Sequence, residues 1–177
     1  MKWRRVVVLF LLVLIAPVAL SVEAGDPAPA WRGENLTGQE VVFPDTSDKQ
    51  VTVLMFWATW CNYCRAFMPY LAAIEEEYRH KNVQVLAVNA KEDDGEDEPA
   101  AEDPRSYMGR HGYGLVTVFN GDAIAQAYAV EYIPGLFVVD ANGMIIYRRG
   151  WTELPAGRQV AEFWDEKVRS VLNVALE

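Results

Sequence analysis

The feature that most restricts this sequence is a C-x-x-C motif between an apolar segment and a helical one. Both cysteines of the chain, Cys61 and Cys64, lie in it. Residues 51–57 (VTVLMFW) precede the motif and form a continuous apolar run, which is typical of a strand buried on both faces. From residue 62 to about residue 81, apolar positions recur with helical spacing. The sequence therefore predicts a strand–C-x-x-C–helix unit.

The position of the cysteines favours redox chemistry. Cys61 is expected at the helix N-terminus, where unpaired backbone N–H groups stabilise a thiolate, the nucleophilic form of cysteine. Cys64 follows three residues later on the same helix face, so the two sulfurs can form a disulfide. One alternative is a structural cross-link, although closing so short a loop contributes only about 2 kcal/mol. The other is half of a metal site, but only His80 and His111 could complete it, so we expect no metal.

Composition excludes several classes of protein. The chain has 177 residues, of which 51% are hydrophobic and 12% aromatic, enough for one domain with a core. Its formal net charge of −9 argues against binding of nucleic acid, which requires a basic surface. Two cysteines are too few for a small disulfide-stabilised scaffold.

The first 24 residues have the pattern of an export signal. Residues 1–5 are basic, residues 6–20 form an uncharged apolar run of 15 residues, and small residues follow. A bilayer span needs about 20 residues, so a cleaved signal peptide is favoured over an N-terminal membrane anchor. In both cases the single domain of residues 25–177, which begins with an expected linker at residues 25–30, lies outside the cytoplasm, where disulfides persist.

The remaining pattern alternates strands with helices. Strands are predicted near residues 40–43, 83–90, 115–120, 136–140 and 144–149, and helices near residues 104–111, 122–128 and 154–175. Asn142-Gly143 predicts a hairpin between the last two strands. This order indicates an α/β fold with a mixed sheet. Residues 91–104 interrupt it with eight acids and one base, which is typical of a solvated loop.

The segment around the cysteines resembles a known family. Residues 56–64 (FWATWCNYC), with Pro69 five residues later, are similar to the active-site segment of the thioredoxin superfamily. The secretory N-terminus, the early hairpin and the residues at 88–89 and 133–135 resemble, more narrowly, the extracytoplasmic TlpA/ResA/DsbE-type thiol–disulfide oxidoreductases. The resemblance implies a thioredoxin-like fold, with a central mixed β-sheet flanked by helices, an N-terminal β-hairpin and a helix–strand insertion before a cis-proline.

The resemblance also implies roles for individual residues. Cys61 would attack a substrate disulfide, and Cys64 would resolve the mixed disulfide. Pro134 takes the place of the family's cis-proline beside the cysteines. Because proline has no N–H, the backbone of Ile133 is then free to pair with an extended substrate segment. Trp60 is expected at the substrate surface.

Two further positions differ from cytosolic thioredoxins, which carry a buried Asp two residues before the first Trp of the motif. Here that place is taken by Met55, before Trp57, and Trp57 itself is expected either at the substrate surface or in the core. TlpA/ResA-type proteins often carry an acid soon after the next strand, and Glu92 matches that place. A carboxylate near the sulfurs could take the proton from Cys64 as it attacks. The alternative is that Glu92 only begins the acidic segment.

The expected function is thiol–disulfide exchange with protein substrates in the periplasm. The resemblance favours a reductant for cytochrome c maturation or copper-site assembly, recharged by a membrane thiol electron donor. It needs no cofactor, because the dithiol carries the two electrons. The alternatives are a generic disulfide oxidant, a copper-binding assembly factor, for which C-x-x-x-C with a distant His is more typical, and a thiol peroxidase. Peroxidases carry Thr three residues before the reactive Cys, whereas Thr59 lies two before Cys61.

Overall fold

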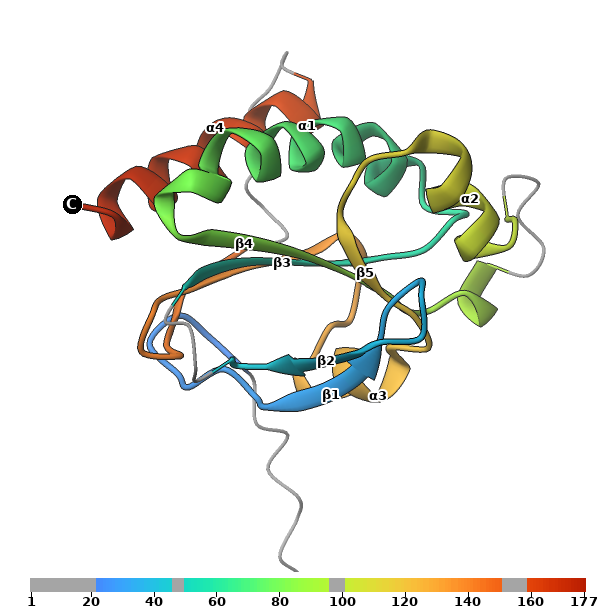
Figure 1. Ribbon diagram of the computed structural model, residues 1–177, viewed down its shortest axis with the longest axis horizontal. Coiled ribbons are helices and arrows are strands. Elements are labelled where there is room, and N and C mark those ends of the chain that lie inside the picture. The colour runs from blue at the N-terminus through green and yellow to red at the C-terminus, as the bar shows by residue number, and fades with distance from the viewer. Residues whose placement is uncertain (1–21, 46–49, 96–100, 151–158) are drawn as a thin grey trace, which may run out of the picture.

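The computed structural model describes residues 22–45, 50–95, 101–150 and 159–177 and is built around a mixed sheet. Five strands follow the order β5-β4-β3-β6-β7 (Figure 1). Their bounds are β3 (Val51–Trp57), β4 (Val83–Asn89), β5 (Val116–Val118), β6 (Gly135–Val139) and β7 (Ile145–Arg148). The central strand β3 pairs in parallel with β4 and antiparallel with β6. The predicted mixed sheet and the predicted hairpin of β6 and β7 are therefore confirmed.

Both faces of the sheet are covered (Figure 1). Helices α1 (Asn62–Tyr78) and α4 (Val160–Ala175) pack side by side on one face. The other face carries α3 (Asp122–Ala127) and the N-terminal hairpin of β1 (Trp31–Glu34) and β2 (Glu40–Phe43). The predicted helix–strand insertion is formed by α2 (Pro104–His111) and β5, and α2 lies at the end of the molecule where α1 begins. Two short 3-10 helices, η1 (Arg79–Lys81) and η2 (Asp93–Gly95), complete the described elements.

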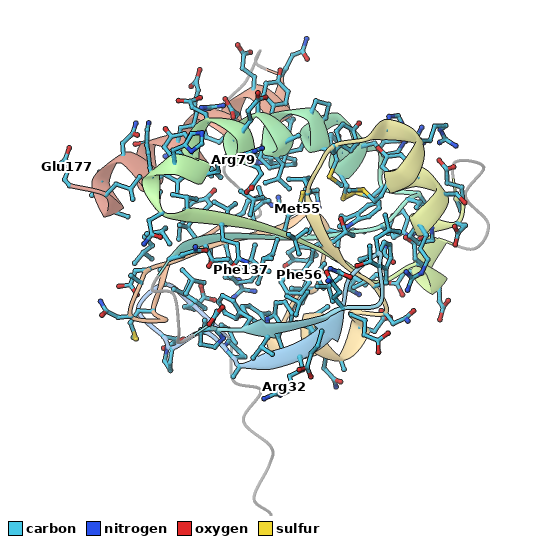
Figure 2. All side chains as sticks on the ribbon, viewed as in Figure 1. Arg32, Met55, Phe56, Arg79, Phe137 and Glu177 are labelled. Carbon is cyan, nitrogen blue, oxygen red and sulfur yellow. A yellow bond between two sulfur atoms is a disulfide. The ribbon has the colours of Figure 1, made fainter. Side chains whose placement is uncertain are left out.

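The sheet separates two hydrophobic clusters, which explains the unbroken apolar run of β3. All seven residues of β3 are buried, and successive side chains of a strand point to opposite faces. Met55 joins the cluster beneath α1 and α4, whereas Phe56 joins Phe137 in the cluster beside the N-terminal hairpin (Figure 2). A strand buried on both faces is predominantly apolar, and β3 fits this with Thr52 as its one polar residue, as expected of the central strand.

The segment expected to be a linker, residues 25–30, is held against the last hairpin instead. The N–H of Gly25 donates to the carbonyl of Ile145 at 2.8 Å, and the N–H of Ala28 donates to the carbonyl of Gly143 at 2.8 Å. The expectation of a linker is therefore wrong. The backbone of β7 and its turn offers acceptors that the composition of this segment did not reveal.

Of the predicted signal segment, only residues 22–24 belong to the described part of the chain, and residues 1–21 lie outside it. Arg148 donates to the carbonyl of Val22 at 2.6 Å and forms an ion pair with Glu23 at 2.6 Å. Within the described ranges, no helix is both long and apolar enough to cross a membrane. The signal peptide or anchor stays a prediction.

Candidate active site

The two cysteines lie at the junction of β3 and α1. Cys61 is the N-cap residue of α1 and forms a disulfide with Cys64, with the two Cα atoms 5.2 Å apart. The Sγ atom of Cys61 accepts a hydrogen bond from the backbone N–H of Cys64 at 3.1 Å. After reduction the same N–H can stabilise a thiolate on Cys61. Cys61 is 4% exposed and Cys64 is fully buried, so Cys61 is the more accessible of the two sulfurs.

Trp60, directly before Cys61, is held by the segment that follows β4. Its Nε1 donates to the carbonyl of Lys91 at 2.7 Å. Gly95 lies directly against the indole, because a Cβ atom added at Gly95 would lie 2.1 Å from Cγ of Trp60. Only glycine fits at this close approach. The expected surface position of Trp60 is thus set by residues more than thirty positions later in the chain.

The peptide bond between Ile133 and Pro134 is cis, which confirms the prediction of a cis-proline. Strand β6 begins only at Gly135, so Ile133 lies outside the sheet ladder. The carbonyl of Pro134 accepts a hydrogen bond from Nε of Arg149 at 2.7 Å. Since Pro134 has no N–H and its carbonyl already has a partner, Ile133 is the residue whose backbone can meet a substrate strand. That substrate contact stays a prediction.

An open groove of about 410 Å³ lies beside the motif. We call it the aromatic groove, because four of its eleven lining residues are aromatic and two of these are well exposed, Tyr63 at 60% and Tyr132 at 45%. Exposed aromatic side chains of this kind are frequent in binding surfaces. The groove is lined by Trp60, Tyr63, Lys91, Asp94, Glu131, Tyr132, Ile133, Pro134, Arg149, Val160 and Trp164.

Trp60, Ile133 and Pro134 are the lining residues that the sequence predicted, and Trp164 and Arg149 are among those that it missed. The guanidinium carbon of Arg149 lies 4.9 Å from the ring centre of Trp164, and the rings of Tyr63 and Trp164 meet edge to face at 6.3 Å. The Nε1 atom of Trp164 is buried and has no hydrogen-bond partner among the described residues. Trp164 is buried in the cluster beneath α1 and α4 and also lines the groove. Residue type was the available signal, since Trp and Arg are enriched where binding energy is concentrated.

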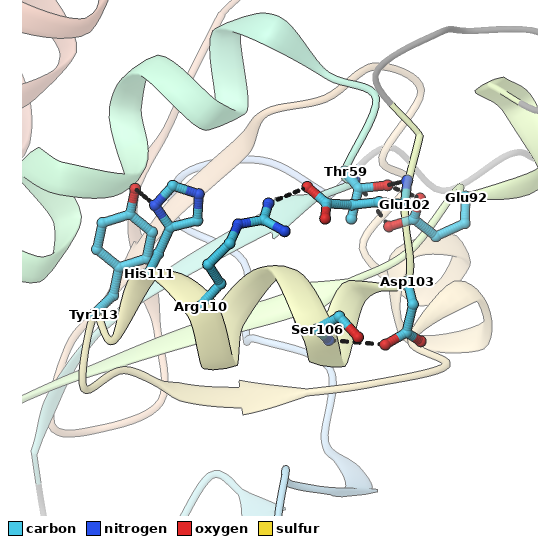
Figure 3. A network of polar contacts seen from close by, with 8 residues as sticks. All are labelled: Thr59, Glu92, Glu102, Asp103, Ser106, Arg110, His111 and Tyr113. Carbon is cyan, nitrogen blue, oxygen red and sulfur yellow. Dashed lines mark hydrogen bonds and ion pairs between the residues drawn. The ribbon is translucent and has the colours of Figure 1, made fainter.

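Glu92 belongs to a polar network that starts two residues before Cys61 (Figure 3). Its Oε1 accepts from the N–H of Thr59 at 2.9 Å and from Nδ2 of Asn89 at 2.5 Å, and its Oε2 accepts from the hydroxyl of Thr59 at 2.7 Å. The hydroxyl of Thr59 accepts in turn from the N–H of Glu102 at 3.1 Å. We call these four residues the carboxylate network. Glu92 is half-buried and bound within it, and its role as a proton acceptor stays a prediction.

The acidic segment at residues 91–104 is ordered at both ends, where η2 and the start of α2 lie, and its side chains Asp93, Asp94 and Asp103 are exposed, as expected for a solvated segment. Lys91 has a left-handed φ of 64°, and its backbone N–H donates to Asp122 at 2.7 Å. The chain then enters η2, which ends at Gly95 against Trp60. At the other end, Arg110 forms an ion pair with Glu102 at 2.6 Å, and this contact lowers the pKa of the Glu102 carboxyl. Residues 96–100 lie outside the described residues.

Met55 and Trp57 both belong to the core, and both are fully buried. Of the two positions expected for Trp57, the core is therefore the correct one. Its ring packs against Tyr107 of α2 with ring centres 5.4 Å apart, and burial raises the pKa of Tyr107 to about 12. The place of the buried Asp of cytosolic thioredoxins is thus filled by the apolar side chain of Met55.

Comparison with known proteins gives the same assignment. The family model described as the AhpC/TSA family matches residues 24–148. The thiol-disulfide oxidoreductase ResA of Geobacillus thermodenitrificans is 32% identical over 126 residues, which cover 71% of this chain and 68% of that protein. ResA of Bacillus thuringiensis is 28% identical over 126 residues, with the same coverage.

A solved structure extends the likeness to the fold. A crystal structure from Chlorobium tepidum, assigned as a thiol:disulfide interchange protein DsbE, superposes with a TM-score of 0.70 and 25% identity. It covers 89% of this chain and 100% of its own. The expected thioredoxin-like fold is therefore confirmed. The chain belongs to the AhpC/TSA family of the thioredoxin superfamily, as a thiol–disulfide oxidoreductase of the ResA and DsbE type with Cys61 and Cys64 as its cysteine pair.

Proposed function

We propose that this protein is an exported reductant of protein disulfides that serves cytochrome c maturation or copper-site assembly. The observation that carries the chemistry is the N-cap position of Cys61, whose neighbours Trp60 and Tyr63 line the aromatic groove. The groove supplies a surface for a polypeptide, and the cis-proline beside it presents the backbone of Ile133. The relatives named ResA and DsbE support the same reaction class.

The proposed reaction moves two electrons from the protein to the substrate. The Cys61 thiolate attacks one sulfur of the substrate disulfide, and the other substrate sulfur leaves as a thiolate. Cys64 then loses its proton, and its thiolate attacks Sγ of Cys61, which releases the second substrate thiolate. The protein is left with its Cys61–Cys64 disulfide, and the substrate takes up protons to become a dithiol. A thiol donor at the membrane is proposed to reduce the disulfide again.

Glu92 is the proposed acceptor of the Cys64 proton. A general base must lie within hydrogen-bond reach of the proton, either directly or through one water. The carboxylate of Glu92 is fixed on Thr59, close in sequence to the cysteines, while the apolar Met55 fills the place of the Asp that thioredoxins use. These two facts favour the interpretation of Glu92 as the base over its interpretation as an ordinary surface charge.

The expected reducing potential depends on Glu92 acting on the cysteine pair. A stabilised thiolate favours the dithiol form and makes such a protein an oxidant. Nearby carboxylates act in the opposite direction, because like charges disfavour a thiolate. The N-terminus of α1 favours the thiolate by about 0.3–1 kcal/mol, as helix termini generally do. We expect Glu92, together with a chain of net charge −9, to outweigh that effect.

The direction of transfer is tested by the reduction potential. The purified protein is equilibrated with thiol redox buffers, and the fraction of dithiol is measured from the mass added by an alkylating reagent. We expect a potential near or below about −270 mV, the value typical of thioredoxin. A potential near about −120 mV, typical of a strong periplasmic oxidant, would contradict the reductant role and leave the oxidoreductase chemistry intact.

The proposed periplasmic location is supported by the basic residues 1–5 and the apolar run at residues 6–20. Cell fractionation followed by N-terminal sequencing of the recovered protein tests it. We expect the protein outside the cytoplasm, either beginning near residue 25 or still carrying the segment and attached to the inner membrane. Recovery of the chain in the cytoplasm, with the segment intact, would contradict export.

A further inference from the structure

Thr59 is an unusual residue for its position, because it is polar and fully buried at the end of the apolar strand β3. Within the part of the chain that the structure describes, its polar contacts belong to the carboxylate network (Figure 3). The N–H of Thr59 donates to one oxygen of Glu92 at 2.9 Å, and the hydroxyl donates to the other at 2.7 Å. A single residue therefore holds both oxygens of the carboxylate and fixes the orientation of its plane.

The direction of the Thr59 hydroxyl proton follows from its neighbours. A hydroxyl has one proton to donate and accepts with its lone pairs. The N–H of Glu102 already donates to this oxygen at 3.1 Å, and the carboxylate of Glu92 can only accept. The hydroxyl proton must therefore point at Glu92.

The segment that precedes α2 anchors this arrangement from the far side. Glu102 is fixed by its ion pair with Arg110 at 2.6 Å. The next residue, Asp103, is the N-cap of α2 and accepts from the N–H of Ser106 at 2.8 Å. The inserted helix thereby holds the Glu102 N–H against Thr59, and a chain of contacts runs from α2 to Glu92 (Figure 3).

We propose that Thr59 is a positioning residue for proton transfer. It holds the Glu92 carboxylate in the orientation that accepts the proton of Cys64, and the N–H of Glu102 sets the direction of its hydroxyl. The inference rests on the proposed function of Glu92. It also gives the inserted helix α2 a place in the chemistry.

The test compares Thr59→Val with Thr59→Ser. Valine keeps the shape of threonine and removes the hydroxyl, whereas serine keeps the hydroxyl. The reduced protein is mixed with a synthetic peptide disulfide, and single-turnover rates are followed from about pH 5 to about pH 9, around the ordinary thiol pKa of about 8.5. We expect Thr59→Val to slow the reaction about tenfold near neutral pH, with a changed pH–rate profile, and Thr59→Ser to stay within about twofold of the wild type.

Thr117 provides a matched control, because it is a second buried threonine whose hydroxyl donates to a backbone carbonyl, that of Leu115, at 3.4 Å. Thr117→Val should leave the rate and its pH dependence unchanged. A pH–rate profile of Thr59→Val that superposes on the wild type would overturn the inference. So would a Thr59→Ser variant that is as slow as Thr59→Val.

A double-mutant cycle with Glu92→Gln separates this inference from the function on which it rests. If Thr59 acts through Glu92, Thr59→Val should cause no further loss in a Glu92→Gln background. Additive losses would overturn the role of Thr59 and leave Glu92 as the base. An unchanged rate in Glu92→Gln itself would overturn the role of Glu92 as the base, and the inference about Thr59 with it. The oxidoreductase chemistry is tested separately by Cys61→Ser, which should lose all turnover.

Arg110→Gln tests the same chain of contacts if Thr59→Val does not fold. This exposed substitution weakens the hold on Glu102 and leaves the core untouched. We expect it to slow turnover about two- to threefold near neutral pH in the wild-type background, since an exposed ion pair is only a weak constraint on Glu102. The same substitution should have no effect in the Glu92→Gln background. Equal slowing in both backgrounds would contradict the proposed chain.

Discussion

The aromatic groove and the carboxylate network both include a residue just before the C-x-x-C motif, Trp60 in the groove and Thr59 in the network, but they differ in exposure and in rigidity. The groove is open, and its side chains Tyr63 and Tyr132 are largely exposed. The network is closed around Thr59, which has no exposed surface, and three donors within 2.9 Å fix the carboxylate of Glu92. One region can adapt to a partner, whereas the other has a fixed geometry.

This difference matches two separate demands of disulfide exchange. A substrate surface must accept different polypeptide segments, and exposed aromatic side chains provide apolar contact without demanding one partner geometry. A proton transfer needs its acceptor within about 2.6–3.2 Å of the donor, which requires rigid support. We therefore expect changes in the groove to affect binding and changes in the network to affect the rate of the chemical step.

The largest effect should follow from removing the cysteine pair. Cys61→Ser should abolish reduction of a peptide disulfide, because the attacking thiolate is gone. Cys64→Ser should accumulate a mixed disulfide on Cys61, since nothing resolves it. Mass spectrometry of the trapped species checks both. Faster alkylation of Cys64 than of Cys61 in the reduced protein at neutral pH would reverse the assignment.

The next largest effect should come from the network. Glu92→Gln keeps the shape of the side chain and its carbonyl acceptor but removes the base. We expect single-turnover reduction to slow by about 100-fold near neutral pH, the lower end of the usual contribution of a general base. The slowing should diminish as the pH rises, because hydroxide can then remove the thiol proton without the help of Glu92. A pH–rate profile identical to that of the wild type would return Glu92 to the role of a surface charge.

A smaller effect is expected at the cis-proline beside the groove. Pro134→Thr introduces a backbone N–H and removes the ring, which changes the surface that Ile133 and Pro134 present to a substrate strand. We expect exchange with a peptide disulfide to slow about tenfold, or mixed disulfides to persist longer. Stopped-flow fluorescence and non-reducing gels measure these outcomes. Wild-type exchange in this variant would show that the backbone of Ile133 is not used by the substrate.

The smallest effect in this series concerns the wall of the groove. Gly95→Ala would place a Cβ atom 2.1 Å from Cγ of Trp60, so the indole must move. We expect the unfolding free energy to fall by about 1–3 kcal/mol and peptide affinity to drop severalfold. Gly109→Ala is the matched control, because nothing lies within 4 Å of a Cβ at that position of α2, and it should be neutral or slightly stabilising. Equal denaturation curves for both variants would contradict the packing described for Trp60.

Local patterns in the sequence were sufficient for much of the fold. The uninterrupted apolar run of β3, the Asn142-Gly143 turn and the helical spacing of α1 each report on residues close together in the chain. The cysteine pair was predictable for the same reason, since its chemistry depends on three-residue spacing at a helix start. The cis bond at Pro134 was predictable only through the resemblance to a family, because X–Pro bonds are cis in only about 5% of cases.

The carboxylate network could not be predicted from such patterns. The contact of Thr59 with Glu92 joins residues 33 positions apart, and that with Glu102 joins residues 43 positions apart. The network also follows a left-handed turn at Lys91. Lysine is not a residue type that favours positive φ, so the sequence did not indicate this turn. The cis bond between Phe43 and Pro44 and the groove position of Trp164 were missed for a similar reason, because both depend on tertiary context.

The central claim, that the groove binds substrate and the network drives the chemical step, is tested most directly by saturation kinetics. Single-turnover rates of Tyr63→Ala and Glu92→Gln are measured against increasing concentrations of one peptide disulfide. We expect Tyr63→Ala to raise the half-saturating concentration about threefold to tenfold, with the maximal rate unchanged, as for loss of an exposed contact worth about 1 kcal/mol. Glu92→Gln should lower the maximal rate and leave the half-saturating concentration unchanged. If both substitutions changed the same parameter, the division between the two regions would be wrong.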